Sequence, residues 1–211
     1  VAQHPQFAAR RTTKRIDGID VTGWFTEDFT LAELRTLRAR ERIPHLRPAN
    51  AQFDGQFGIP TLDEILALVA AANAHRVDEA ARRGAAAPAP IGVYPETKHP
   101  SYFRGIGLPL ERALVGALHA AGYAGRTAPV FLQSFETGNL RELRALTDLP
   151  IVQLIEARGA PWDLRAAGDA RTYADLLTPA GLDDIATYAN AIGPPKDLVI
   201  ARDAAGRLVA P

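Results

Sequence analysis

The chain has 211 residues, enough for one large domain with a core, and 47% of them are apolar, which excludes an intrinsically disordered protein. Lys plus Arg and Asp plus Glu number 24 each, so no excess of positive charge supports a nucleic-acid partner or an anionic membrane surface. The absence of Cys excludes disulfides and thiolate metal sites, and no apolar run approaches the roughly 20 residues of a membrane span. We therefore expect a globular protein with no nucleic-acid partner and no membrane span.

The first 60 residues are polar and rich in turn signals. Residues 16–21 resemble a short hairpin around Asp17-Gly18, a dipeptide that favours a tight turn. A capping box at residues 30–33 then predicts a helix that ends before Pro44.

The next predicted helix has a stronger signal in the sequence. A second capping box, at residues 61–64, precedes an apolar stripe at helical spacing, and the pattern ends in an Ala/Pro linker at residues 85–90.

From residue 91 onward, short apolar segments alternate with helical patterns. The helical patterns begin near Leu110, Leu140 and residue 180. The predicted strands cover residues 91–96, 128–133, 150–155 and 191–193. This alternation predicts βαβ units and a parallel sheet, hence the α/β class. An open doubly wound sheet and a closed (β/α)8 barrel both fit, although only about four of the eight units that a barrel needs follow residue 90.

Polar side chains follow three of the predicted strands. They are Glu96 and Lys98, Gln133 and Ser134, and Gln153 and Glu156. Residues two apart on a strand point to the same side, so the carboxylate of Glu96 and the ammonium of Lys98 are predicted to face one space. A carboxylate can hold a hard metal ion and an ammonium can hold phosphate, which indicates phosphate ester chemistry. The alternative is an ordinary ion pair at a strand end that meets solvent.

The segment 156–179 is longer than most connections between a strand and a helix. It contains Trp162 and Tyr173, and two interpretations are open. The segment forms either a lid or leaving-group pocket over the predicted site, or a packed excursion on the surface.

Several segments together resemble the glycerophosphodiester phosphodiesterases, most closely the periplasmic or secreted type. The similarity runs from about residue 26 to residue 195, and the Tyr-Pro-Glu-x-Lys element is its most specific part. The segments that carry it are Phe29-Thr-Leu-Ala-Glu-Leu34, Ile59-Pro-Thr-Leu-Asp-Glu64, Val93-Tyr-Pro-Glu-Thr-Lys98, Val130-Phe-Leu-Gln-Ser-Phe135, Ile151-Val-Gln-Leu-Ile155 and Ile192-Gly-Pro194.

This resemblance implies a (β/α)8 TIM barrel that hydrolyses a small-molecule glycerophosphodiester to an alcohol and glycerol 3-phosphate. It implies a divalent cation, Ca²⁺ or Mg²⁺, held by three carboxylates of which Glu96 matches the third. Lys98 matches the lysine that contacts the phosphate, and we expect both residues to act in catalysis. Gln133 and Phe135 match the end of the fourth strand, which lines the substrate pocket.

The departures from the family pattern are equally informative. The His-Arg-Gly strand, the Glu-Pro-Asp metal pair and the His-Asp pair that open the family are not found in this sequence. The resemblance therefore implies a partial barrel, about strands three to six, with the catalytic histidines outside this chain and no activity for the chain alone. Because residue 1 is Val and no signal-like segment follows it, we expect an internal fragment of a longer protein. The resemblance implies that this protein is periplasmic or secreted. We expect residues 1–211 to form a single domain in which residues 1–60 are an insertion-like region before the third strand.

Two alternatives fit the same residues. One keeps the barrel and the metal but changes the substrate, as in a relative of lysophospholipase D or sphingomyelinase D. The other is a non-catalytic barrel that acts as a binding module.

Overall fold

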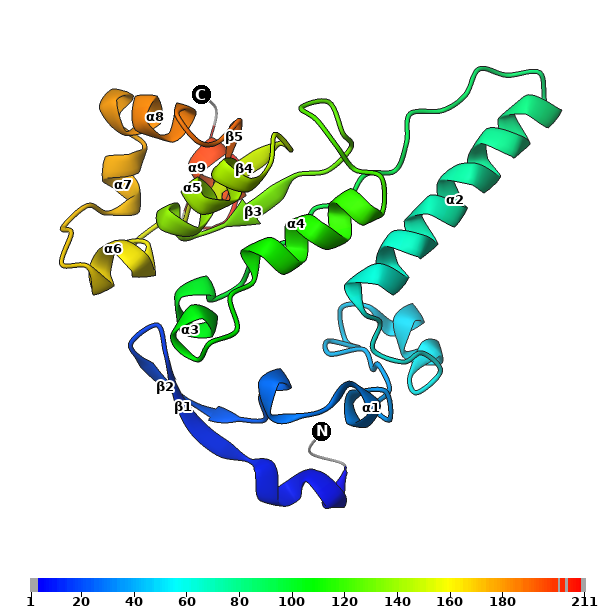
Figure 1. The fold of residues 1–211 in the computed structure, drawn as a ribbon, viewed down its shortest axis with the longest axis horizontal. Helices are drawn as coiled ribbons and strands as arrows, with labels where there is room; N and C mark the ends of the chain where they lie inside the picture. The colour runs from blue at the N-terminus through cyan, green and yellow to red at the C-terminus, as the bar shows by residue number, and fades with distance from the viewer. Residues whose placement is uncertain (1–3, 201, 204, 210–211) are drawn as a thin grey trace. The chain divides into compact units, whose positions relative to one another are not determined.

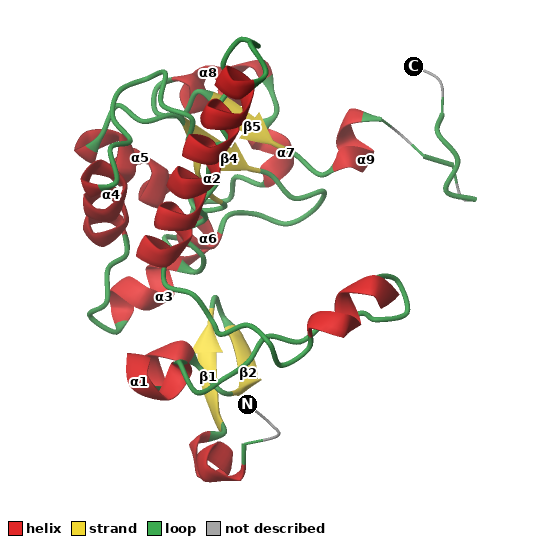
Figure 2. Cartoon of the chain, turned by 90° about the vertical axis from the view of Figure 1, so that its right-hand side faces the viewer, coloured by secondary structure: helices red, strands yellow, loops and turns green. Residues whose placement is uncertain are grey.

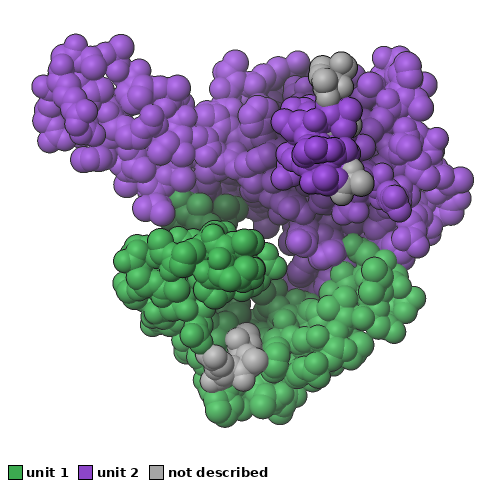
Figure 3. All heavy atoms as spheres, turned by 180° about the vertical axis from the view of Figure 1, so that it is seen from behind, with its two compact units in different colours: residues 1–65 green, residues 66–211 purple. Residues whose placement is uncertain are grey.

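A computed structural model describes residues 4–200, 202–203 and 205–209 (Figure 1). The chain divides into two compact units, Val1–Ile65 and Leu66–Pro211, which are coloured separately in Figure 3. This division leaves the single domain and the insertion-like role of residues 1–60 as predictions.

The first unit contains a β-hairpin and several short helices. The hairpin consists of β1, Thr12–Ile16, and the antiparallel β2, Ile19–Gly23. Asp17 and Gly18 have φ angles of 50° and 77°, the pair of positive values that a two-residue type I′ turn requires. The predicted hairpin is therefore confirmed, and it is longer than expected. The short helices are η1, Pro5–Arg10; η2, Thr26–Asp28; α1, Leu31–Leu34; and η3, Pro48–Phe53.

Helix α1 begins at the predicted capping box but lasts only one turn. Thr30 accepts from the backbone of Glu33, whose carboxylate in turn accepts from the Thr30 backbone. The helix ends before Pro44, as predicted, but it already stops at Leu34. The Arg38 guanidinium donates to the carbonyls of Arg35 and Leu37, both at 2.8 Å, and so uses groups that a longer helix would need.

Arg10 contacts residues that are distant from it in the sequence of the first unit. Its guanidinium donates to both carboxylate oxygens of Glu33, at 2.9 and 2.5 Å, and its Cζ atom lies 5.0 Å from the centre of the Phe29 ring. Phe29 in turn meets the buried Phe7 ring edge to face. A bidentate ion pair, a cation–π contact and an edge-to-face ring pair thus hold a unit whose described residues bury few large apolar side chains.

The second unit contains a three-stranded parallel sheet with the order β3-β4-β5, whose strands are labelled in Figure 1. Figure 2 draws strands in yellow and helices in red, and labels β4 and β5 of this sheet. Strand β3 is Leu132–Ser134, β4 is Ile151–Leu154 and β5 is Ala191–Gly193, so the predicted strands at 150–155 and 191–193 are confirmed. The helices are α2, Leu62–Arg82, whose first turn belongs to the first unit; α3, Pro100–Gly105; α4, Glu111–Ala120; α5, Thr137–Leu146; α6, Trp162–Ala166; α7, Tyr173–Leu176; α8, Pro179–Ala186; and α9, Lys196–Val199.

Residues 93–97 lie beside β3 in a parallel arrangement without forming a regular strand. The Val93 N–H donates to Pro129 and its carbonyl accepts from Phe131, both at 3.0 Å. The Pro95 carbonyl accepts from Gln133, and the Thr97 N–H donates back to Gln133, again at 3.0 Å. The position between these bonds belongs to Pro95, which has no N–H. The predicted strand at 91–96 is therefore two isolated bridges, Val93 with Val130 and Glu96 with Gln133.

Helix α5 packs against β3 and β4, and α4 packs against α5. Leu118 of α4, Leu140 and Leu143 of α5, and Ile151 of β4 have no exposed surface. Helix α4 ends where Gly122 takes a φ of 90°, and the Tyr123 N–H reaches back to the Leu118 carbonyl. The apolar stripes of α4 and α5 therefore face the sheet or one another.

The side chain of Asn73 joins α2 to the start of the segment that leads into the sheet. Its amide nitrogen donates to the Ile91 carbonyl at 3.0 Å, and its oxygen accepts from the Ile91 N–H at 2.7 Å. One side chain thus satisfies both backbone groups of Ile91, as a neighbouring strand would.

The segment 156–179 is a packed excursion rather than an open loop. It contains α6 and α7, and it buries Leu164, Tyr173 and Leu176. Among the described residues, no helix is both long enough and apolar enough to cross a membrane.

The substitution Leu140→Ala should lower the free energy of unfolding by about 2–5 kcal/mol, because it opens a cavity at a fully buried site between α5 and the sheet. Urea unfolding followed by circular dichroism would measure this loss. Leu108→Ala, at a position that is 49% exposed, should change it by less than about 0.5 kcal/mol. Equal losses in the two variants would contradict the packing of α5.

Candidate functional site

One face of the parallel sheet carries the predicted site residues. The parallel register pairs Glu96 with Gln133, Gln133 with Val152, and Val152 with Ala191. Paired residues of neighbouring strands point to the same face, and so do residues two apart along one strand. Glu96, Gln133 and Phe135 therefore belong to one face of the sheet, which we call the candidate face.

The burial pattern agrees with this assignment at the end of the 93–97 segment. Thr97 is only 3% exposed, whereas its neighbours Glu96 and Lys98 are both exposed. This alternation is that of an extended chain with one buried side. Glu96 and Lys98 thus leave the chain on the side opposite to Thr97, and their role as site residues stays a prediction.

Directly after Lys98 the chain turns sharply. His99 has φ 53° and ψ 47°, a left-handed conformation that is uncommon for a residue other than Gly, and α3 begins at the next residue, Pro100. The bend ends the extended segment at Lys98.

Gln133 and Phe135 are half-buried and held by neighbours. The Gln133 side-chain amide donates to the Tyr94 carbonyl at 3.1 Å, so it links β3 to the 93–97 segment. The Phe135 ring meets the buried Tyr173 ring edge to face, with 6.2 Å between their centres. Each of the two residues thus has a side-chain contact with a neighbour, and the contact of Phe135 comes from Tyr173 in the packed 156–179 segment.

Sequence reasoning missed two aromatic residues on the candidate face. Tyr94 and Phe131 lie two positions before Glu96 and Gln133, are 50% and 45% exposed, and meet edge to face at 5.9 Å. A Cβ atom at Gly193 would lie 3.5 Å from the Tyr94 hydroxyl, so this ring reaches across the sheet toward β5. Side chains of a strand alternate between its two faces, so the argument that placed Glu96 and Lys98 on one side could also have placed Tyr94 and Phe131 there.

Two of the predicted strand-end residues belong to the opposite face. Ser134 and Gln153 have no exposed surface. The Ser134 hydroxyl donates to the Thr97 carbonyl at 3.2 Å, and the oxygen of the Gln153 side chain accepts from the Tyr188 hydroxyl at 2.9 Å. Polar residues do follow these strands in the sequence, but the period of two places Ser134 and Gln153 in the core rather than on the candidate face.

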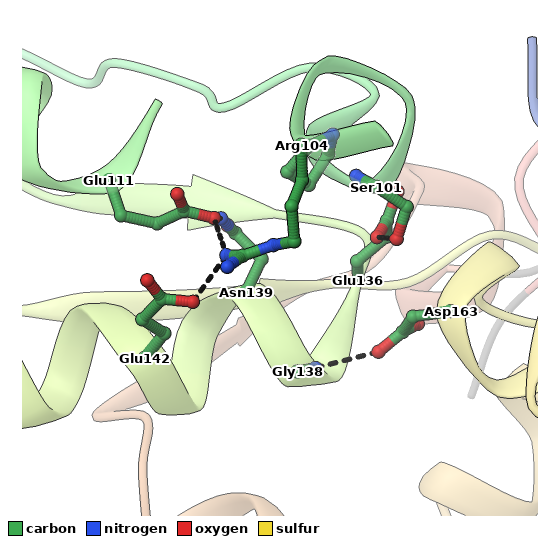
Figure 4. A pocket seen from close by; sticks show the side chains of 9 residues that line it. Ser101, Arg104, Glu111, Glu136, Gly138, Asn139, Glu142 and Asp163 are labelled. Atoms are coloured by element: carbon green, nitrogen blue, oxygen red, sulfur yellow. Dashed lines mark hydrogen bonds and ion pairs between the residues drawn. The ribbon is translucent and has the colours of Figure 1, made fainter. Parts of the chain in front are cut away.

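An acidic cavity of about 260 Å³ lies on the helix side of the sheet, among residues of α3, α4, α5 and α6 (Figure 4). Arg104 reaches between Glu111 and Glu142, and its Nη2 atom lies 2.7 Å from Glu111 Oε1. Asp163 accepts from the Gly138 N–H at 2.6 Å at the start of α5. Each of these three carboxylates is thus tied to a neighbouring element through one oxygen.

The described residues do not form a complete metal centre. Within residues 4–200, 202–203 and 205–209, no three side chains of His, Cys, Asp or Glu gather in a way that could hold a metal ion. Glu96 offers a single carboxylate on the candidate face, and the acids of the cavity in Figure 4 do not form a metal-binding group either. We therefore derive no reaction step through a cation from these residues.

Burial raises the pKa of the Tyr188 hydroxyl to about 12, so unfolding should lower it toward about 10. Below pH 10 both states are protonated and this contribution to stability is complete. As the pH rises from 10 to 12 the unfolded state loses the proton first, so the free energy of unfolding should fall. Tyr188→Phe should remove this part of the fall, as urea unfolding at pH 9, 10 and 11 would show. An identical pH dependence in both proteins would contradict the assignment.

Comparison with known proteins agrees with the sequence resemblance. The model of the glycerophosphoryl diester phosphodiesterase family matches residues 4–211. The chain is 34% identical over 212 residues to Glycerophosphodiester phosphodiesterase GDPD6 of Arabidopsis thaliana. The matched region covers 95% of this chain and 51% of that protein. It is 22% identical over 191 residues to a glycerophosphodiester phosphodiesterase of Haemophilus influenzae, covering 81% of this chain and 49% of that protein.

The chain thus spans about half the length of these curated relatives. The family match covers nearly the whole chain, so it gives no support to the expectation that the catalytic histidines lie outside it. An extent of match this large identifies the family, and with it an α/β fold of TIM-barrel type. The chain belongs to the glycerophosphoryl diester phosphodiesterase family.

Proposed function

We propose that this chain forms part of an enzyme that hydrolyses glycerophosphodiesters to an alcohol and glycerol 3-phosphate. The observation that carries the proposal is the exposure of Glu96 and Lys98 on either side of the buried Thr97, at the carboxyl end of the parallel sheet. Active sites of barrel enzymes lie at this end of the strands. Family membership and the two relatives named as glycerophosphodiester phosphodiesterases support the substrate class.

In this proposal the residues of the candidate face bind and orient the phosphate. Lys98 provides a point charge for a phosphate oxygen, and Gln133 and Phe135 line the pocket for the rest of the substrate. Hydrolysis forms a bond from the water oxygen to phosphorus and breaks the bond to the alcohol oxygen, which leaves with a proton. Lys98 would offset negative charge that develops on the phosphate during this exchange.

The proposed metal ion is inferred from the family resemblance, not from the arrangement of the described residues. We infer from the family resemblance that Glu96 is one ligand of a Ca²⁺ or Mg²⁺ ion, since carboxylates suit hard cations. The other ligands would come from residues that do not gather around Glu96 in the described part of the chain.

We also propose that the chain is a partial barrel, close to strands three to six. Residues 93–97, β3, β4 and β5 follow one another in chain order and are parallel, as neighbouring strands of a barrel wall are. The share of the relatives' length that the chain covers supports the same inference. Catalytic histidines on other segments, inactivity of the isolated chain and a periplasmic or secreted location are parts of this proposal that rest on resemblance alone.

Turnover would test the enzymatic part of the proposal. Glycerol 3-phosphate released from glycerophosphocholine should be undetectable with the isolated chain, whether Ca²⁺, Mg²⁺ or chelator is present. A longer polypeptide that contains this chain should release it only with a divalent cation, and Glu96→Gln should lower that rate by at least about a hundredfold through loss of a ligand charge. Wild-type rates in Glu96→Gln would refute the role of Glu96, and turnover by the isolated chain would refute the proposed partial site.

Binding would test the role of Lys98 independently of turnover. Calorimetric titration of the chain with glycerol 3-phosphate should show a dissociation constant that rises about tenfold or more in Lys98→Ala, because a charge-assisted hydrogen bond is lost. Lys196→Ala removes an exposed lysine at α9 and serves as the matched control, with no expected change. Equal affinities in all three proteins would contradict a phosphate contact at Lys98.

A further inference from the structure

A chain of buried hydrogen bonds runs from the helix side of the sheet to the residue between Glu96 and Lys98. The Thr97 hydroxyl donates to the side-chain oxygen of Asn139 at 2.5 Å. The Asn139 amide nitrogen donates to Glu111 Oε1 at 2.6 Å, and Arg104 donates to the same oxygen at 2.7 Å. Figure 4 shows Arg104 at the outer end of this chain, between Glu111 and Glu142.

The three inner members are almost completely buried. Thr97 is 3% exposed, Asn139 is 5% exposed and Glu111 is 1% exposed. Buried polar groups are costly when they lack partners, so each hydrogen bond here constrains the side chains at both of its ends. The network joins α4 and α5 to the 93–97 segment more specifically than apolar packing would.

Thr97 is fixed through both its backbone and its side chain. Its N–H donates to the Gln133 carbonyl at 3.0 Å, and its hydroxyl is held by Asn139 on α5. The segment needs this second attachment because Pro95 removes one of the backbone bonds to β3. With Thr97 held at two points, the directions in which Glu96 and Lys98 leave the chain are set as well.

We propose that Thr97, Asn139 and Glu111 form a positioning relay for the phosphate site at Glu96 and Lys98. None of the three lies on the candidate face, so they act by holding the backbone between the two site residues. The inference rests on the proposed function, because it assigns a role to a site whose ligand is a phosphate ester. Its structural part, the restraint of residues 96–98 by α5, has a separate readout.

The test compares two buried threonines in the second unit of the full chain. Thr97→Val keeps the shape of the side chain but removes the donor to Asn139. Thr147→Val is the matched control, since Thr147 is 9% exposed and its hydroxyl bonds to His119 at 3.0 Å and accepts from the Leu149 N–H at 3.2 Å. Thr97→Ser keeps the hydroxyl and serves as the conservative variant. Asn139→Ala breaks the relay from α5 and replaces Thr97→Val if the latter fails to fold.

Two quantities are measured for each protein, the dissociation constant for glycerol 3-phosphate and the hydrogen exchange rate of the Thr97 amide. Thr97→Val and Asn139→Ala should each weaken binding about tenfold and speed exchange at Thr97, in keeping with the loss of one buried hydrogen bond. Thr97→Ser should stay within about twofold of the wild type in binding, and Thr147→Val should leave both quantities unchanged.

Unchanged binding and exchange in Thr97→Val would overturn the relay. So would an equal weakening in Thr147→Val, which would show a general effect of stability. If the wild-type chain fails to bind glycerol 3-phosphate, the proposed function fails, and the exchange rate at Thr97 alone then supports or overturns the restraint by Asn139.

Discussion

The backbone pairing between residues 93–97 and the residues around β3 determines what the candidate face contains. Its hydrogen bonds leave one position unfilled at Pro95, and they still fix the register of Glu96 beside Gln133. A shift of one residue would exchange the two sides of the segment. It would bury the carboxylate of Glu96 among the helices and expose Thr97, at a high cost for an unpaired charge. The register is therefore enforced by desolvation as much as by the hydrogen bonds themselves.

The two faces of the sheet differ in the burial and hydrogen bonding of their polar groups. On the helix side, Thr97, Ser134 and Gln153 are buried, and every one of them has a hydrogen-bond partner. On the candidate face the charged residues are exposed, and the aromatic pair Tyr94 and Phe131 belongs to the same face. Buried polar groups that have partners, as these three do, add rigidity, whereas exposed charges beside aromatic surface remain available to a ligand.

Patterns in the sequence predicted the positions of the helices and strands better than they predicted which residues contact one another. The hairpin turn, the long α2 and the strands β4 and β5 follow from local signals that act within a few residues, namely positive-φ turn residues, capping boxes and apolar periodicity. Short α3 was missed because its sequence has no apolar stripe, and it forms where the chain bends at His99.

Part of the candidate site could also be predicted from a local pattern in the sequence. Glu96 and Lys98 share a side because a strand has a period of two, and the structure keeps that alternation around Thr97. The inward direction of Ser134 and Gln153 could not be predicted, since the sequence does not say which face of a short apolar strand meets the helices. Asn139 and Glu111 look like ordinary polar residues of helices until the fold brings them to Thr97.

The double attachment of Asn73 to Ile91 bears on how the sequence could vary. The amide fixes the position of α2 along its own axis relative to Ile91, whatever path the chain takes between them. The Ala/Pro stretch at residues 85–90 thus closes a loop whose two ends are already held, and closing a longer loop adds little entropy cost. Insertions and deletions in that stretch should accumulate without disturbing the entry of the chain into the sheet, so homologous sequences would differ there in length before they differ at Asn73.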